Sequence, residues 1–294
     1  MNPIAVPAAV PTSVAICDHF RALAPRYDVV LCDVWGVVHD GVAAYAPACD
    51  ALTRYRAGGG TVVLITNAPR PSPWVIRQLD RLGVPRDAYD DVMTSGDLTR
   101  DEVAARGGAV FHIGPERDIT IFEGIDIRFV SADAAAYAVC SGLFDDTKEG
   151  PEDYRELLAG MRARGLLMIC ANPDLVVARG DKLVYCAGAI AELYAALGGE
   201  VLYAGKPHAP IYRSALAKAE QARGAPAPAG RTLAIGDSLR TDIAGALALG
   251  IDGLFVSGGI HAAEFRDNPS GDALADIFAA AGVTPHAVTP RLVW

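Results

Sequence analysis

The sequence predicts an α/β protein whose main domain is a doubly wound, mainly parallel sheet. Short apolar and β-branched runs alternate with longer segments of helical spacing, which is typical of parallel strands covered by helices. Of the 294 residues, 51% are apolar and 21% are charged, and this composition excludes an intrinsically disordered chain. At about 150 residues per domain, the length favours two domains.

The first elements follow the order expected of such a sheet. They are a strand at 27–33, a helix at 49–56, a strand at 61–66, a helix at 72–82 and a strand at 92–94. The run 61–66 (TVVLIT) is continuous, as in a strand buried on both faces. Ser72 and Pro73 are typical of the start of a helix, and Gly83 is typical of its end.

The pattern changes between residues 97 and 187, where short strand candidates surround one helix at 152–164. The strand candidates are 109–113, 127–130, 138–140, 166–170 and 182–185. This segment is long enough for a smaller α/β domain inserted into the first one. We therefore expect a discontinuous core domain, residues 1–96 and 188–294, and an inserted cap domain, residues 97–187.

After the insert, strand and helix candidates alternate again. They are a helix at 190–197, a strand at 201–204, a helix at 210–222, a strand at 232–235, a helix from about 241 and a strand at 253–256. These elements are expected to complete the sheet of the core domain. The tail 284–294 ends in an apolar Leu-Val-Trp, which suits docking on the core or on a partner chain.

Charge and cysteine usage restrict the partners and the cellular location that we expect of the protein. Lys and Arg total 26 against 35 Asp and Glu, so the net charge is −9 and a general nucleic-acid partner is not expected. The six cysteines are widely spaced, so we expect reduced thiols and a cytoplasmic location. Prolines interrupt the uncharged N-terminal stretch, and no other stretch reaches the length of a spanning helix. Neither a signal peptide nor a membrane span is therefore expected.

Four polar clusters follow predicted core strands. They are Asp33-Val-Trp-Gly-Val, Thr66-Asn67, Gly205-Lys206-Pro207 and Gly236-Asp-Ser-Leu-Arg-Thr-Asp242. Each alone has an ordinary structural explanation, namely a turn, a helix cap or a surface lysine. Together they fall at the carboxyl ends of the strands, where open α/β sheets bind their ligands. The sequence therefore predicts a ligand site at this edge.

The residue types in these clusters suit phosphoryl chemistry. Mg²⁺ prefers oxygen ligands and is held by one or two carboxylates together with substrate phosphate. An ammonium such as that of Lys206 and a hydroxyl such as that of Thr66 can neutralise the other phosphoryl oxygens. An aspartate can also attack phosphorus and form an aspartyl-phosphate, which water then hydrolyses.

In this order, the four clusters resemble the motifs of the haloacid dehalogenase-like (HAD) superfamily. The insert resembles the cap of its class IIA branch, the nitrophenyl-phosphatase and pyridoxal-phosphatase-like hydrolases. Within the insert, Ala171-Asn-Pro-Asp174 resembles the cap signature of that branch. The resemblance extends from about residue 27 to residue 256, and it implies a Rossmann-like core with an inserted cap.

The resemblance also implies a role for each matching position. Asp33 would be the nucleophile, and Lys206 would neutralise both Asp33 and the phosphate. The implied Mg²⁺ ligands are Asp33, the backbone carbonyl of Trp35, Asp237 and, directly or through water, Asp242. The implied substrate-binding residues are Trp35, Gly36, Thr66, Asn67, Asn172 and Asp174. The implied substrate is a small phosphorylated metabolite, and the branch suggests a homodimer.

Trp35 departs from the phosphatase pattern, which has an aspartate two residues after the nucleophile. That aspartate protonates the leaving group and later activates water, and an indole N–H does neither near neutral pH. A phosphatase would need a good leaving group or a substitute acid such as His39, Asp40 or a cap residue. An alkyl phosphate hydrolysed as fast as an aryl phosphate would point to such a substitute.

Three other functions remain open from the sequence. A dehalogenase would use Asp33 on carbon, but such relatives lack the metal carboxylates that Asp237 and Asp242 supply here. A metal- and phosphate-binding protein with slow turnover would tolerate Trp35. A receiver-type phosphoacceptor domain combines similar residues, but it is much shorter and has no inserted cap.

Overall fold

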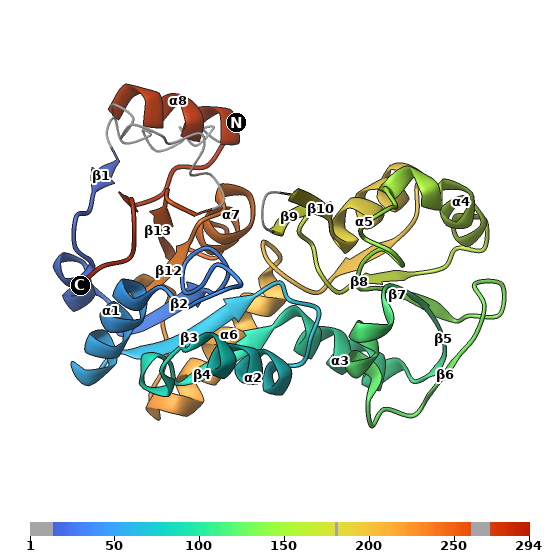
Figure 1. The fold of residues 1–294 in the computed structure, drawn as a ribbon, viewed down its shortest axis with the longest axis horizontal. Coiled ribbons are helices and arrows are strands. Elements are labelled where there is room, and N and C mark those ends of the chain that lie inside the picture. The colour runs from blue at the N-terminus through green and yellow to red at the C-terminus, as the bar shows by residue number, and fades with distance from the viewer. Residues whose placement is uncertain (1–13, 180–181, 260–270) are drawn as a thin grey trace, which may run out of the picture.

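The computed structural model describes residues 14–179, 182–259 and 271–294. These residues form two lobes that lie side by side, each built around a parallel sheet (Figure 1). The larger lobe combines the N-terminal and C-terminal parts of the chain, and the segment between them forms the smaller lobe. The predicted α/β fold class, with its inserted α/β unit, is confirmed.

The larger lobe contains a seven-stranded sheet in which every neighbouring pair of strands is parallel. The strand order is β1-β14-β13-β12-β2-β3-β4. The strands are β1 Ala15–Ile16, β2 Val29–Asp33, β3 Thr61–Thr66, β4 Asp91–Thr94, β12 Thr232–Gly236, β13 Asp252–Val256 and β14 Ala287–Thr289. The sequence does not predict the edge strands β1 and β14, because runs of two or three residues carry too little pattern.

The helices begin and end at residues of the expected type. The α-helices of the described residues are α1 Ala46–Ala57, α2 Ser72–Leu82, α3 Ser95–Arg106, α4 Arg155–Ala163, α5 Ala187–Ala196, α6 Ala209–Arg223, α7 Ala244–Leu247 and α8 Gly271–Ala281. Helix α2 has Pro73 in its first turn and ends before Gly83, whose φ is +85°. Helix α3 begins with a capping box, in which Thr94 and Asp97 each bond the other's backbone N–H.

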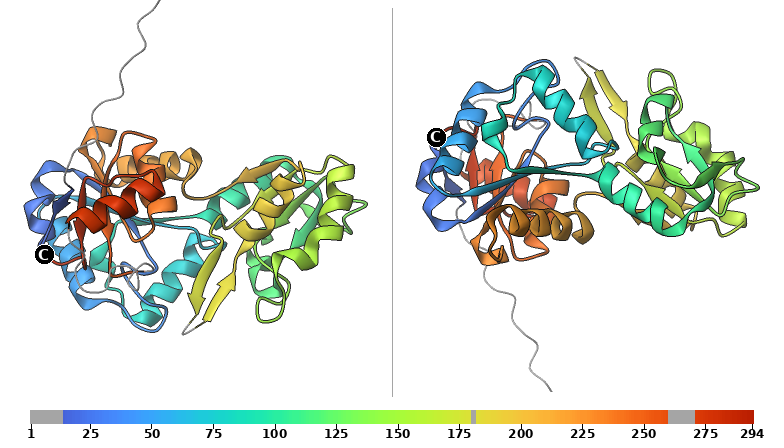
Figure 2. Two further views of the ribbon diagram at one scale, coloured as in Figure 1. Left: turned by 90° about the horizontal axis from the view of Figure 1, so that it is seen from above. Right: turned by 90° about the horizontal axis from the view of Figure 1, so that it is seen from below.

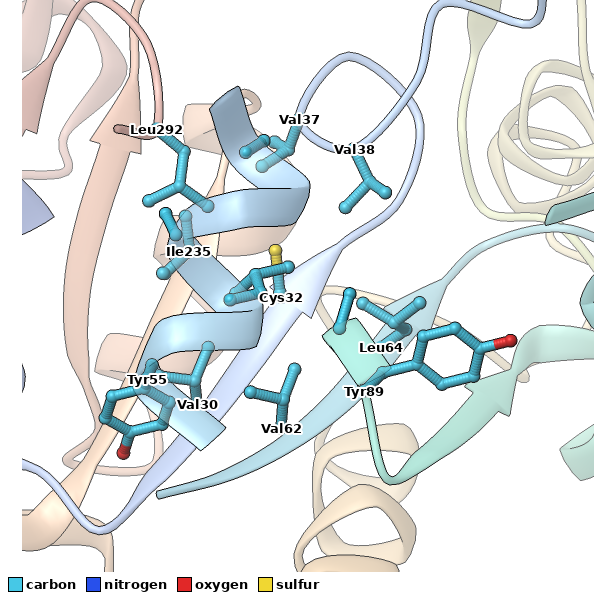
Figure 3. Close-up of a cluster of buried hydrophobic side chains, with 14 of the residues drawn as sticks. Val30, Cys32, Val37, Val38, Tyr55, Val62, Leu64, Tyr89, Ile235 and Leu292 are labelled. Atoms are coloured by element: carbon cyan, nitrogen blue, oxygen red, sulfur yellow. The ribbon is translucent and has the colours of Figure 1, made fainter. Parts of the chain in front are cut away.

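Helices cover both faces of the seven-stranded sheet, as a doubly wound fold requires. Successive residues of β2 point to opposite faces. Val30 and Cys32 belong to a cluster with α1 and α2, whereas Val29 and Leu31 pack against α6. Figure 3 shows the first of these clusters, in which the Tyr55 ring of α1 lies beside Val30 of β2. Burial on both faces explains why these strands read as continuous apolar runs.

The smaller lobe contains a five-stranded parallel sheet in the order β11-β8-β7-β5-β6. Its strands are β5 Gly108–Ile113, β6 Ile127–Phe129, β7 Tyr137–Cys140, β8 Met168–Cys170 and β11 Val201–Tyr203. Leu158 of α4 and Ile190 of α5 pack with Cys140 and Met168 on one face of this sheet. The predicted helix at 152–164 is α4, which follows the short 3-10 turn Pro151–Tyr154.

The end of the insert differs from the sequence expectation. The expected boundary at residue 187 assigns α5 and the strand near 201–204 to the core domain, but β11 pairs with β8 in the smaller sheet. Helix α5 also packs within the smaller lobe, through Ile190 and Tyr194. A three-residue apolar strand does not reveal which of two sheets it joins, so the sequence placed it wrongly. The smaller sheet therefore extends to Tyr203.

A two-stranded antiparallel hairpin stands at the junction of the lobes, formed by β9 Val176–Arg179 and β10 Lys182–Tyr185. Both views in Figure 2 show it projecting between the larger and smaller lobes. The C-terminal tail docks on the core, where the Trp294 ring meets Phe20 at 6.0 Å between centroids. No helix among the described residues combines the length and apolar character needed to cross a membrane.

Candidate active site

The carboxyl ends of the core strands open onto a cavity of about 250 Å³ that residues of both lobes line. Strand β2 ends at Asp33, β3 ends at Thr66, and Asp237 directly follows β12. The hairpin contributes Val176 from the other side. The full lining is Asp33, Trp35, Thr66, Asn67, Asp174, Leu175, Val176, Val177, Lys206, Asp237, Ser238, Arg240, Thr241 and Asp242.

Most site residues predicted from the sequence thus meet in one cavity, and two lie behind its wall. Gly36 lies against Asp237 and borders a neighbouring cavity of about 290 Å³. Asn172 supports the wall from the smaller lobe, because its Oδ1 accepts a hydrogen bond from the backbone N of Asp174 at 3.1 Å. The sequence motifs do not show whether a residue lines the cavity or supports a neighbour that does.

Lys206 is the electrostatic centre of the site. Its side chain is 3% exposed, and Nζ donates hydrogen bonds to Asp33 Oδ1 at 2.5 Å and to Asp242 Oδ1 at 2.6 Å. A third bond, at 3.3 Å, goes to the carbonyl oxygen of Ile65. Burial opposes the charge of Lys206, but Asp242 and Asp33 outweigh that effect and hold the pKa of the ammonium well above its usual value.

Three buried carboxylates form a set that fits a hard divalent cation. Asp33, Asp237 and Asp242 can each place one oxygen within 4.8 Å of the others. Burial raises the pKa of Asp33 and of Asp242, and Lys206 acts in the opposite direction on both. A cation beside these oxygens would offset their mutual repulsion, and an all-oxygen donor set is the one Mg²⁺ prefers.

A glycine makes room for one of these carboxylates. Gly36 has a φ of +82°, and a Cβ at this position would lie 2.0 Å from Asp237 Oδ2. Any L side chain would therefore meet both backbone strain and a direct clash. The Gly36 N–H donates to the carbonyl oxygen of His39 at 2.8 Å, which fixes the turn that brings the glycine against Asp237.

Asn67 joins the second motif, the third motif and the smaller lobe. Its Nδ2 donates to Asp174 Oδ1 at 2.9 Å, and its Oδ1 accepts from the backbone N of Lys206 at 2.7 Å. Thr66, the preceding residue, accepts at Oγ1 from the N–H of Ala68 at 3.2 Å, so its own hydroxyl hydrogen is left to donate. The cavity thus combines fixed carboxylates, one ammonium, a hydroxyl donor and an amide.

Comparison with known proteins agrees with this geometry. Residues 30–128 match the family model described as haloacid dehalogenase-like hydrolase, and residues 203–281 match a second model, HAD-hydrolase-like. A crystal structure of a haloacid dehalogenase-like hydrolase from Brucella suis is 48% identical, with a TM-score of 0.85 over 95% of this chain and 100% of that chain. This chain belongs to the haloacid dehalogenase-like hydrolases.

Other members of this hydrolase family carry more specific names. D-glycerol 3-phosphate phosphatase of Mycobacterium tuberculosis is 29% identical over 83% of this chain, and the alignment covers 66% of that relative, just under two thirds of its length. Ribonucleotide monophosphatase NagD of Escherichia coli is 29% identical over 81% of this chain and 91% of its own length. These phosphatase relatives confirm the resemblance to the class IIA branch.

Trp35 of this hydrolase lines the cavity, whereas the two nearby groups considered as substitute acids do not. His39 is 3% exposed, and its Nδ1 accepts from the N–H of Gly41 at 2.9 Å. Asp40 is exposed, and its Oδ1 accepts from the N–H groups of Val42 and Ala43 at 2.8 Å. Both side chains thus serve the loop that follows the nucleophile.

Part of the wall of this hydrolase's cavity is not predicted by the sequence motifs. Arg240 belongs to the fourth motif but received no role, and its guanidinium pairs with Glu192 of α5, across the two lobes. Leu175, Val176 and Val177 follow directly on the predicted cap signature. Their apolar run after Asp174 was the one signal that could have included them in the site.

Proposed function

We propose that this hydrolase is a Mg²⁺-dependent phosphatase of a small phosphorylated metabolite and that Asp33 forms a transient aspartyl-phosphate. The observation that carries the proposal is the buried set of Asp33, Asp237 and Asp242 around one ammonium, that of Lys206. Phosphatase relatives support the reaction class. The related glycerol phosphate phosphatase structure, 27% identical to this chain with a TM-score of 0.62, is a complex with calcium.

In this proposal each residue around the phosphoryl group has a separate task. Asp33 attacks phosphorus, and Lys206 holds Asp33 in place while it offsets negative charge in the site. The Thr66 hydroxyl and the backbone N–H of Asn67 donate to phosphoryl oxygens, because both hydrogens of the Asn67 side-chain amide are bonded to Asp174 and to the carbonyl oxygen of Lys206. Asp33, Asp237, Asp242 and the Trp35 carbonyl would hold Mg²⁺, which would supply further neutralisation of the phosphoryl charge.

A second function, binding of metal and phosphate with slow turnover, is favoured by Trp35. A missing acid at this position removes assistance that is typically about 10²–10⁴-fold. Dehalogenation by Asp33 is the less favoured alternative, because carbon displacement gives no use to the carboxylates of Asp237 and Asp242. The three functions predict different products, so one set of assays separates them.

The test is phosphate release from p-nitrophenyl phosphate and from a panel of phosphorylated metabolites, with Mg²⁺ and with a chelator. We expect metal-dependent turnover, and we expect Asp33→Asn to lower it by at least about 10³-fold on every substrate. Asp40→Asn is the matched control, since Asp40 lies in the same loop, outside the cavity, and keeps its acceptor oxygen after the change.

The other outcomes assign the other functions. Halide release from a haloacid that persists in chelator would make this protein a dehalogenase. Phosphate binding detected by calorimetry, with no turnover on any substrate, would establish the binding function. Full activity in Asp33→Asn would remove Asp33 from the nucleophile role.

A further inference from the structure

A phosphatase with Trp35 in place of the usual aspartate needs another source for the proton that its leaving group takes up. Four carboxyl groups line the cavity, and three of them belong to the set around Lys206. The fourth, Asp174, comes from the smaller lobe. It lines the same cavity as Asp33, which stands at the end of β2 in the larger lobe.

The position of Asp174 is fixed by close packing of its backbone. A Cβ at Gly205 would lie 2.7 Å from Pro173 Cδ, and a Cβ at Gly188 of α5 would lie 2.5 Å from the carbonyl oxygen of Asp174. The loop thus packs directly on two glycines, one in the third motif and one in α5. Such contacts allow little movement of the loop relative to Lys206, which follows Gly205.

The carboxyl group of Asp174 is held from one side and open to the cavity on the other. Its Oδ1 accepts from Asn67 Nδ2 at 2.9 Å, and Asn67 is in turn bonded to the backbone of Lys206. Removal from water raises the pKa of Asp174, and the charge of Lys206 and the Asn67 bond act in the opposite direction. A raised carboxyl pKa keeps more of the protonated form near neutral pH.

The other polar groups of the wall are poor sources of a proton. The guanidinium of Arg240 is paired with Glu192, and Ser238 and Thr241 offer only hydroxyl groups. His39 and Asp40 are bonded into the loop outside the cavity. Asp174 is therefore the one carboxyl of the described lining that lies outside the predicted set of metal ligands.

We propose that Asp174 is the general acid and base of this enzyme, in the role that an aspartate at position 35 has in related phosphatases. The inference rests on the proposed phosphatase function. Asp33 forms a bond to phosphorus as the bond to the leaving oxygen breaks, and the proton of Asp174 moves to that oxygen. Water then attacks phosphorus, Asp174 takes its proton, and the bond to Asp33 breaks to release inorganic phosphate.

The decisive variant is Asp174→Asn, which keeps an oxygen acceptor for Asn67 but removes the acid. On an alkyl phosphate we expect kcat to fall about 10²–10⁴-fold, because the alkoxide leaves without a proton. On p-nitrophenyl phosphate the leaving group needs no proton. The first step therefore survives, and a burst of one p-nitrophenol per active site should precede slow turnover.

A second readout is the aspartyl-phosphate itself, which should accumulate when it forms but is hydrolysed slowly. Intact-protein mass should show one added phosphoryl group on Asp174→Asn during turnover of p-nitrophenyl phosphate, and none on the wild type. The Asp33→Asn/Asp174→Asn double variant should show neither burst nor added mass, which assigns the trapped group to Asp33. Thermal unfolding of each variant confirms that its fold is intact.

The outcomes separate this inference from the function on which it rests. No phosphate release by the wild type on any substrate would overturn both. An active wild type together with equal losses on alkyl and aryl phosphates and no burst in Asp174→Asn would leave the phosphatase in place and reduce Asp174 to a binding residue. An unchanged Asp174→Asn enzyme would overturn the inference as well.

Discussion

At Gly36 a backbone conformation and the position of a carboxylate depend on the same missing side chain. The left-handed φ of +82° turns the chain after the nucleophile strand, and the absent Cβ leaves space for Asp237 Oδ2. The sequence motif alone predicted a substrate contact for this glycine. In the structure Gly36 makes room for a carboxylate and does not line the main cavity, and its contact with a substrate stays a prediction.

The first prediction concerns Gly36→Ala. We expect the added methyl group to displace Asp237 and to raise the Mg²⁺ concentration needed for half-maximal activity by about tenfold or more, the range found when supports of a metal ligand are removed. Gly59→Ala is the matched control, because Gly59 has a φ of +93° and open space around its Cβ position. Both variants should lose about 1 kcal/mol of stability from backbone strain, so a shared Mg²⁺ effect would contradict the argument.

At the scale of elements, a hydrogen-bonding side chain of helix α6 holds the turn that carries the fourth motif. The π-turn Leu239–Ile243 places Asp242 beside Lys206. The hydroxyl of Tyr212, in α6, donates to the carbonyl oxygens of Thr241 at 3.0 Å and Asp242 at 2.9 Å. A π-turn leaves backbone carbonyls less regularly paired than an α-helix, and two of them share the single hydroxyl hydrogen of the tyrosine.

The second prediction is that Tyr212→Phe lowers both stability and metal affinity. Loss of the buried hydroxyl leaves two carbonyl oxygens without this donor, which should cost about 1–2 kcal/mol of unfolding free energy. The turn should then hold Asp242 less firmly, so more Mg²⁺ should be needed for activity. Tyr137→Phe in the smaller lobe removes a single 3.4 Å bond and should leave the Mg²⁺ dependence unchanged. Chemical denaturation and Mg²⁺ titration of activity measure the two effects.

Elements buried on both faces could be predicted from the sequence, and elements defined by their neighbours could not. Strands β2 and β3 consist of apolar runs because helices cover both sides of them, so their runs stand out. Strand β11 has the same kind of run, but its partner β8 decides its lobe. The hairpin strand β9 was not predicted, although the sequence carries a two-residue hairpin signal, Gly180-Asp181, between it and β10.

The same contrast applies to the site. Asp33 and Asp237 could be predicted because they stand at the ends of strands β2 and β12, and parallel strands of one sheet end at one edge. Lys206 follows β11 of the smaller sheet, so this rule does not account for its place in the site. Val176 and Arg240 could not be assigned to the wall, because their place depends on how the smaller lobe sits over the larger one. The sequence predicts the side of the cavity that the strand ends of the larger sheet form. Tertiary packing decides which residues form the side next to the smaller lobe.

On the scale of the whole molecule, the two lobes have largely separate cores. Clusters around β2 and β3 fill the larger lobe, and clusters around β7 and β8 fill the smaller one. Polar pairs connect them, such as Asn67 with Asp174 and Arg240 with Glu192. The net charge of −9 therefore includes carboxylates at this junction that Lys206 offsets, which is compatible with a phosphorylated substrate.

Because the cores are separate, a titrating group within one lobe can make the stability of that lobe depend on pH. His112 in β5 is partly buried, and its Nε2 lies 2.9 Å from Ser141 Oγ. Burial lowers the pKa of His112 from 6.5 to about 4. Between these values the unfolded chain binds more protons than the folded one, so unfolding free energy falls as pH drops from 6.5 and levels off below about 4.

We therefore predict that His112→Gln makes the protein less sensitive to mild acid. From neutral pH down to about pH 5 the wild type should lose at most about 2 kcal/mol of stability through His112, and the variant should lack this loss because glutamine does not titrate. Glutamine can still bond Ser141, so other interactions of the smaller lobe persist. Denaturant unfolding of both proteins at the two pH values gives the loss of unfolding free energy for each. The loss in the wild type minus the loss in the variant isolates His112, because all other titrating groups contribute equally to both. Equal acid sensitivity would show that His112 is protonated without cost in the folded protein.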